Sequence, residues 1–137
     1  MVSSSVLRSF CELAKVDHLI FKFRVYQVLF GNSQEGTRDF VTHTDCRLGK
    51  WYYKGEGKTK FSHLPGYPEI EEPHARVHEC ALTALRAHAN ADEDATVAAV
   101  AEMEHASLVV LENLERMAES GEADKGLICP RENERDK

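Results

Sequence analysis

The feature that most constrains this chain is an apolar repeat that runs unbroken along residues 7–28. Its members recur at alternating spacings of four and three residues, which is the period of one face of an α-helix. No stretch of useful length alternates apolar and polar residues as a half-buried strand would. The repeat predicts a helix over residues 3–30 with a histidine in the middle of its buried face. The stripe consists of Leu7, Cys11, Ala14, His18, Phe21, Val25 and Val28.

A second, shorter helix is predicted to follow a polar connection. We expect it to begin at Cys46, with Thr44 or Asp45 as its cap, and to end at Gly55. A short helical turn should follow, ending at Phe61. This segment places a cysteine at a helix N-terminus, where free N–H groups and the helix dipole favour a thiolate.

Two longer helices are predicted in the second half of the chain. Pro73 suits the first position of a helix over residues 73–90, because its missing N–H has no helical partner there. Asp92 can cap a fourth helix over residues 93–119, which Gly121 is expected to stop. The fourth helix carries a stripe at heptad spacing, made of Val100, Met103, Ser107, Val110, Leu114 and Met117.

Together these segments predict an all-α fold, a four-helix bundle with an extra short helix. The 137 residues suit one domain rather than two. We assign residues 1–120 to this domain and expect the charged segment 121–137 to be a disordered tail. The stripes allow a helix-mediated homodimer, but they equally suit a monomer in which they only fill the core.

Charge and cysteine use exclude several classes of protein. A net charge of −6 without a basic patch argues against nucleic-acid binding. No apolar run is long enough to span a membrane, and the N-terminus lacks the pattern of a secretory signal. The four cysteines form no CxxC pair, which favours reduced thiols and a cytoplasmic location over a disulfide framework.

Four residues on three predicted helices form a candidate zinc site. His74 and His78 are four residues apart and so share one helix face. His18 lies on an apolar stripe, where an unpaired imidazole is unfavourable, and Cys46 opens a helix. Three imidazoles and one thiolate suit tetrahedral Zn²⁺. The alternatives are a core histidine bonded to a carbonyl for His18 and a small buried apolar residue for Cys46.

Other readings of the same residues are weaker. Gly57-Lys58-Thr59 lacks the earlier glycine and the strand of a phosphate-binding loop. Glu71-x-x-His74 and Glu102-x-x-His105 suggest a di-iron bundle, but we expect Glu71 to precede its helix. A catalytic zinc or a cysteine nucleophile stays open, although Cys46 as a fourth ligand would close the site. We therefore expect no enzyme. Candidates to orient the imidazoles are Asp17, Asp45 and Glu79.

Three sequence blocks resemble the chemoreceptor zinc-binding (CZB) domain of bacterial chemoreceptors and some diguanylate cyclases. They are His18-Leu19-Ile20, Cys46-Arg47-Leu48-Gly49-Lys50-Trp51 and His74-Ala75-Arg76-Val77-His78. The resemblance spans about residues 8–118. Ile20 departs from the family's aromatic residue or Leu, a change that should alter packing and not ligation.

The resemblance implies a dimeric helical bundle with zinc on the residues matching His18, Cys46, His74 and His78. It also implies a signalling input of the type found at the C-terminus of cytoplasmic chemoreceptors, cut from a longer receptor or standing alone. Its partners would be a second copy, the receptor's signalling coiled coil and, through it, the chemotaxis histidine kinase. The stimulus would be an oxidant such as hypochlorous acid acting on zinc-bound Cys46, or zinc availability itself.

Overall fold

The computed structural model of the chain describes residues 2–124, most of which are helical, with no strand among them. The longer helices are α1 (Val2–Leu29), α2 (Arg47–Lys54), α3 (Glu71–Ala89) and α4 (Glu93–Ala123). Short turns of 3-10 helix span η1 (Thr37–Asp39) and η3 (Pro68–Ile70), and a π-helical turn spans η2 (Gly57–Phe61). The prediction of an all-α bundle is therefore confirmed.

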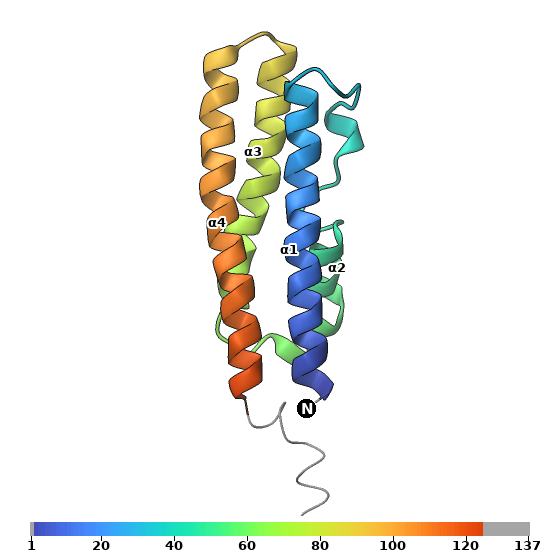
Figure 1. Ribbon diagram of the computed structural model, residues 1–137, viewed down its shortest axis with the longest axis vertical. Helices are drawn as coiled ribbons and strands as arrows, with labels where there is room; N and C mark the ends of the chain where they lie inside the picture. The colour runs from blue at the N-terminus through green and yellow to red at the C-terminus, as the bar shows by residue number, and fades with distance from the viewer. Residues whose placement is uncertain (1, 125–137) are drawn as a thin grey trace, which may run out of the picture.

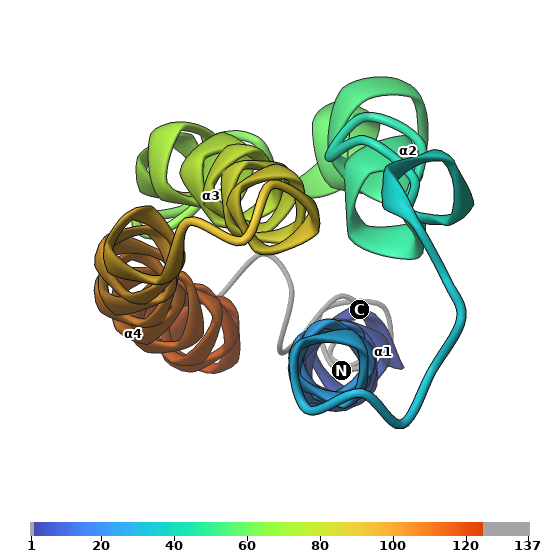
Figure 2. The same ribbon diagram turned by 90° about the horizontal axis from the view of Figure 1, so that it is seen from above.

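The helices surround one core, as Figure 2 shows from above. α3 and α4 form an antiparallel hairpin, and α1 runs beside them with its N-terminus at the same end of the bundle as the C-terminal end of α4 (Figure 1). The short α2 and its connections fill the remaining corner, between α1 and α3 (Figure 2). None of the helices in residues 2–124 is both long and apolar enough to cross a bilayer.

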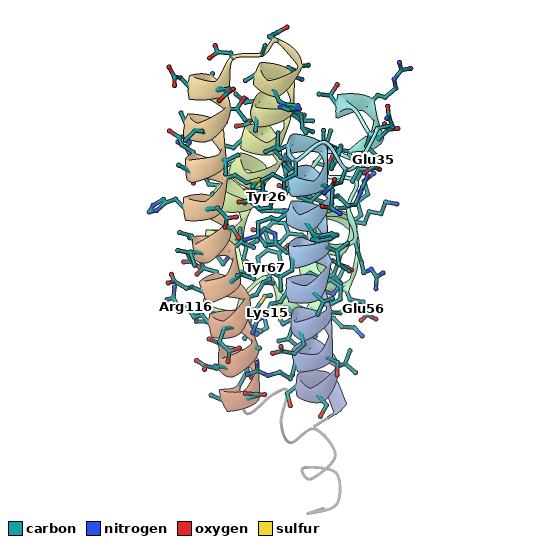
Figure 3. All side chains as sticks on the ribbon, turned by 45° about the horizontal axis from the view of Figure 1, so that its top comes forward. Lys15, Tyr26, Glu35, Glu56, Tyr67 and Arg116 are labelled. Atoms are coloured by element: carbon teal, nitrogen blue, oxygen red, sulfur yellow. The ribbon has the colours of Figure 1, made fainter. Side chains whose placement is uncertain are left out.

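The predicted stripes of α1 and α4 build this core. Leu7, Cys11 and Val25 of α1 are 0% exposed, as are Leu114 and Met117 of α4. Polar side chains border the core along the sides of the helices. In Figure 3, Tyr26 lies between α1 and the α3–α4 hairpin, and Arg116 projects from the outer side of α4.

Three predicted helix ends differ from the observed ones. Cys46 itself is the N-cap of α2, rather than Thr44 or Asp45. α3 begins at Glu71, two residues before Pro73, because the first turn of a helix leaves its N–H groups without helical partners and so tolerates proline. α4 continues through Gly121, which is buried, to Ala123. Packing of the last turn outweighs the roughly 1 kcal/mol helix penalty of glycine.

The predicted tail therefore starts inside α4, and most of it, residues 125–137 with Cys129, lies outside the described residues. The division into a domain over residues 1–120 and a disordered tail stays a prediction.

Candidate metal centre

The sequence around Cys46 places its sulfur at the open end of α2. Cys46 has extended backbone angles (φ −75°, ψ 168°), and its Sγ accepts a hydrogen bond from the backbone N of Gly49 at 3.4 Å. Gly49 is required because a Cβ there would lie 1.9 Å from the carbonyl oxygen of His43. The Cys-x-x-Gly spacing thus lets the preceding loop pass against the first turn of α2 and fixes the sulfur.

His74 and His78 lie one turn apart on the buried face of α3, with exposures of 3% and 6% and ring centroids 5.0 Å apart. Nδ1 of His78 is 3.0 Å from the carbonyl oxygen of Val41. A carbonyl only accepts, so Nδ1 carries the hydrogen and Nε2 keeps its lone pair. Nε2 of His74 lies 3.3 Å from Cys46 Sγ. Each of the three side chains therefore has a sulfur or nitrogen atom near the other two that can donate an electron pair to a metal ion.

These three donors form a compact group. The ligand atoms of Cys46, His74 and His78 all lie within 4.8 Å of one another, in the part of the chain that the structure describes. They border a cavity of about 40 Å³, which suits an ion and is too small for an organic substrate. A larger groove of about 650 Å³, between the end of α1 and the start of α4, contains none of the predicted donors.

His18 lines the same cavity from α1 but lies outside this donor group. Its Nε2 is 2.7 Å from the hydroxyl oxygen of Ser107 on α4. The structure thus brings together three of the four predicted ligands and places the fourth at the edge of their cavity. Ligation by any of the four stays a prediction.

Burial determines the protonation of the donor side chains. It lowers the pKa of His74 to about 2 and the pKa values of His18 and His78 to about 4, so all three imidazoles are neutral at pH 7. Neutral imidazoles are the form that binds a metal ion. Burial also raises the pKa of the Cys46 thiol, and this outweighs the N–H groups of Gly49 and Leu48 that lower it. The backbone N–H groups at the helix N-terminus thus favour the thiolate, as expected, but burial outweighs them.

A thiol and two neutral imidazoles converging on an ion-sized cavity fit Zn²⁺ by their chemistry, because zinc prefers sulfur and nitrogen donors. Cys46, His74 and His78 would hold such an ion. When bound, it would keep the sulfur of Cys46 as a thiolate despite the burial. His18 lines the same cavity and is the predicted ligand that would complete a fourfold set.

Of the residues expected to orient the imidazoles, only Asp17 borders the cavity. Its buried Oδ2 lies 3.1 Å from Nε of Arg47 but accepts no well-aligned hydrogen bond. The Asp17 carboxylate adds to the rise in the pKa of Cys46. Asp45 instead accepts from the hydroxyl of Thr42, and Glu79 is exposed.

Sequence reasoning missed two side chains, those of His43 and Ser107, and two backbone carbonyls, those of His43 and Val41. The ring of His43 lies 5.6 Å from that of His74, and its carbonyl accepts from Cys46 Sγ at 3.6 Å. Ser107 and the Val41 carbonyl hold His18 and His78. A hydroxyl within an apolar stripe was the one available signal, and it pointed to Ser107.

The di-iron reading finds no support in residues 2–124. Glu71 does lie in α3, contrary to expectation, but its carboxylate accepts from the hydroxyl of Tyr53. Glu102 pairs with Arg76 at 2.7 Å. The group of metal-ligating side chains found there contains no carboxylate.

Comparison with known proteins agrees with the geometry. The family model described as the chemoreceptor zinc-binding domain matches residues 18–85, a span that begins at His18 and contains Cys46, His74 and His78. No curated protein and no solved structure matches the chain.

Proposed function

This chain belongs to the chemoreceptor zinc-binding domain family, and from that premise we propose that it is a sensory domain of a bacterial chemoreceptor that responds to oxidants through Cys46. The observation that carries the proposal is the position of Cys46. It is at once the N-cap of α2 and a member of the Cys46–His74–His78 donor group. A chemical change at this one sulfur therefore alters both the metal centre and the start of a helix.

The thiolate is the form of cysteine that reacts with oxidants. In the reaction with hypochlorous acid, the Cys46 sulfur attacks chlorine and hydroxide leaves. Water then replaces chloride on the sulfur, giving a sulfenic acid, a chloride ion and a proton. Sulfur gives up two electrons and chlorine accepts them, so the sum is RS⁻ + HOCl → RSOH + Cl⁻.

Oxidation changes what the Cys46 side chain can do in the protein. A sulfenic acid is a poorer metal ligand than a thiolate, and the sulfur that gains the oxygen is the same atom that accepts the hydrogen bond from Gly49 N. Losing a helix cap typically costs about 1 kcal/mol. Because Trp51 of α2 stacks on Phe10 of α1, with ring centroids 4.2 Å apart, we infer that the change reaches α1 and, through it, the receptor's coiled coil and histidine kinase.

A regulatory role also fits the size and closure of the site. The cavity of about 40 Å³ has no room for an organic substrate, so we propose that the domain is not an enzyme. We place it in the cytoplasm, where reducing conditions keep Cys46 unoxidised until an oxidant arrives.

We further infer a homodimer. The outer side of α1 carries exposed apolar side chains, which a second copy would cover. They are Val16, Leu19, Ile20 and Phe23, with exposures of 51%, 52%, 52% and 61%.

The test is zinc release from the purified chain by stoichiometric hypochlorous acid, followed with a chromogenic chelator. Wild-type protein should bind one zinc ion per chain and release it. Cys46→Ser should bind zinc more weakly and lose the oxidant-triggered release. Cys80→Ser is the matched control, because Cys80 is a half-buried thiol of α3 outside the donor group, and it should behave like wild type. Equal release from Cys46→Ser and wild type would refute the proposal.

A second candidate is a sensor of zinc availability, in a chemoreceptor or a diguanylate cyclase. It is favoured by the position of His18, which borders the cavity while bonded to α4, so that zinc binding would draw α1 toward α2 and α3. This reading requires a dissociation constant within the range of free zinc in the cell. A constant far below that range makes the ion structural and rules this reading out.

A further inference from the structure

Ser107 is the one hydroxyl in the apolar stripe of α4. Its side chain is 0% exposed, and residues on either side of it in the stripe, including Met103, Val110 and Leu114, are equally buried. A buried hydroxyl is unfavourable unless it is hydrogen-bonded, so its place in this stripe calls for a partner.

The partner is the one imidazole in the apolar stripe of α1. Nε2 of His18 and Oγ of Ser107 are 2.7 Å apart, and His18 is 6% exposed. The pair is a buried polar contact between the apolar stripes of the two helices. The same histidine lines the cavity of the metal donors, but Ser107 does not.

The two ring nitrogens of His18 therefore have different neighbours. The nitrogens of an imidazole point in different directions in the ring plane, and in the neutral form one of them carries the hydrogen. With Nε2 occupied by Ser107, Nδ1 is the nitrogen left for the cavity. His78 has the converse arrangement, in which Nδ1 binds the Val41 carbonyl and Nε2 is left for the donor group.

We propose that Ser107 is a positioning residue of the metal site: by accepting a hydrogen bond from Nε2–H of His18, it fixes the ring so that Nδ1 is the nitrogen offered to the metal. Histidine ligands of zinc generally donate their other N–H to such an acceptor, which sets the tautomer. The hydroxyl hydrogen of a helical serine can be donated to the carbonyl four residues earlier. This inference rests on the proposed zinc binding.

The proposal gives α4 a part in a site whose predicted ligands come from α1, α2 and α3. α4 supplies no ligand, yet through Ser107 its position controls the direction of His18. A shift between α1 and α4 would therefore change zinc affinity, and zinc binding would resist such a shift.

The experiment measures the zinc dissociation constant of the full chain by competition with a fluorescent chelator. Ser107→Ala should weaken zinc binding by about 10- to 100-fold, the usual effect of losing such an acceptor. Ser120→Ala, the matched control on the same helix, should leave the constant unchanged. The thermal midpoint of metal-free Ser107→Ala should not fall enough to account for the loss of affinity, which separates positioning from a structural role.

A double-mutant cycle assigns the effect to His18. In a His18→Ala background, which retains three donors, Ser107→Ala should cause no further loss of affinity. Nitrogen NMR of the protein loaded with cadmium-113 should show metal coupling to Nδ1 of His18 and a hydrogen on Nε2.

The outcomes separate this inference from the proposed function. If wild-type protein binds no zinc, the proposed function fails and takes the inference with it. If zinc binds but Ser107→Ala leaves the affinity unchanged, tightens it, or acts equally without His18, the positioning role is wrong while the zinc site stands. Metal coupling to Nε2 of His18 would also overturn it.

Discussion

At the scale of single residues, the metal centre depends on a close backbone approach at Gly49. The loop ending at Cys46 passes so near the first turn of α2 that a Cβ on residue 49 would lie 1.9 Å from His43 O and 2.8 Å from His43 C. The neighbouring atoms belong to the backbone and cannot rotate away. The position of the Cys46 sulfur and of the His43 carbonyl therefore both depend on the absence of a side chain at residue 49.

Gly49→Ala should destabilise the protein by about 3 kcal/mol, the upper part of the range for overpacking at a rigid buried position. It should also weaken zinc binding, because the loop must move and carry Cys46 with it. Urea unfolding and chelator competition measure the two effects. Gly36→Ala is the control, since a Cβ there meets nothing within 4 Å. Equal stability of the two variants would contradict the argument.

The identity of the donors was accessible from the sequence, whereas their surroundings were not. Spacing of four puts His74 and His78 on one helix face, whatever the rest of the fold does. Ser107 lies 89 residues from His18, and no local rule pairs residues at that separation. Cys46 shows the same limit. The N–H groups at the helix end are local and lower the pKa of its thiol as expected, but burial by the folded chain raises that pKa by more.

At the scale of helices, a conventional cap was easier to predict than a boundary set by packing or by an unusual cap. Asp92 was correctly identified as a cap, because its Oδ1 accepts from the backbone N of Ala95 at 3.1 Å. This bond lies within four residues and is encoded locally. The end of α4 was placed four residues early, since Gly121 is a local stop signal that tertiary packing overrides. Cys46 as a cap was missed, because sulfur is an unusual acceptor at that position.

Asp92→Ala should lower the free energy of unfolding by about 1 kcal/mol, the usual effect of losing a helix cap. The loss arises because the N–H of Ala95 then has no partner within the protein. Asp94→Ala removes the same charge in the same first turn but leaves the cap in place, so it should cost clearly less. Chemical denaturation of both variants gives the comparison. A loss from Asp94→Ala as large as that from Asp92→Ala would show that charge, not capping, matters here.

At the scale of the whole molecule, α1 is joined to α4 by polar contacts along much of its length. Arg8 and Lys15 both bind Glu115, at 2.8 Å and 2.6 Å. Toward the other end of α1, Lys22 and Tyr26 both donate to Glu104. The His18–Ser107 contact lies between these two ionic groups. α1 therefore packs against α4 through polar contacts on one side and borders the metal donors on the other, which suits a helix that transmits a change at the site.

This α1–α4 contact should respond to pH through Glu115. Hydrogen bonds from Arg8 and then Lys15 lower the pKa of Glu115 to about 2, below its ordinary value near 4.5. A carboxylate whose pKa is lower in the folded state adds stability above its unfolded pKa. That contribution declines as the pH falls from about 4.5 toward 2. Since Glu115 is 37% exposed, solvent screening limits it to about 1 kcal/mol.

Glu115→Gln should therefore cost about 1 kcal/mol at pH 7 and almost nothing near pH 2, as measured by urea unfolding at both pH values. Glu112→Gln, an exposed position on the same helix, serves as the control and should cost little at either pH. High salt should reduce the loss at pH 7, because the ion pairs are partly exposed. An equal loss at both pH values would mean that Glu115 stabilises the α1–α4 contact by packing its side chain, and that charge does not join these helices at this position.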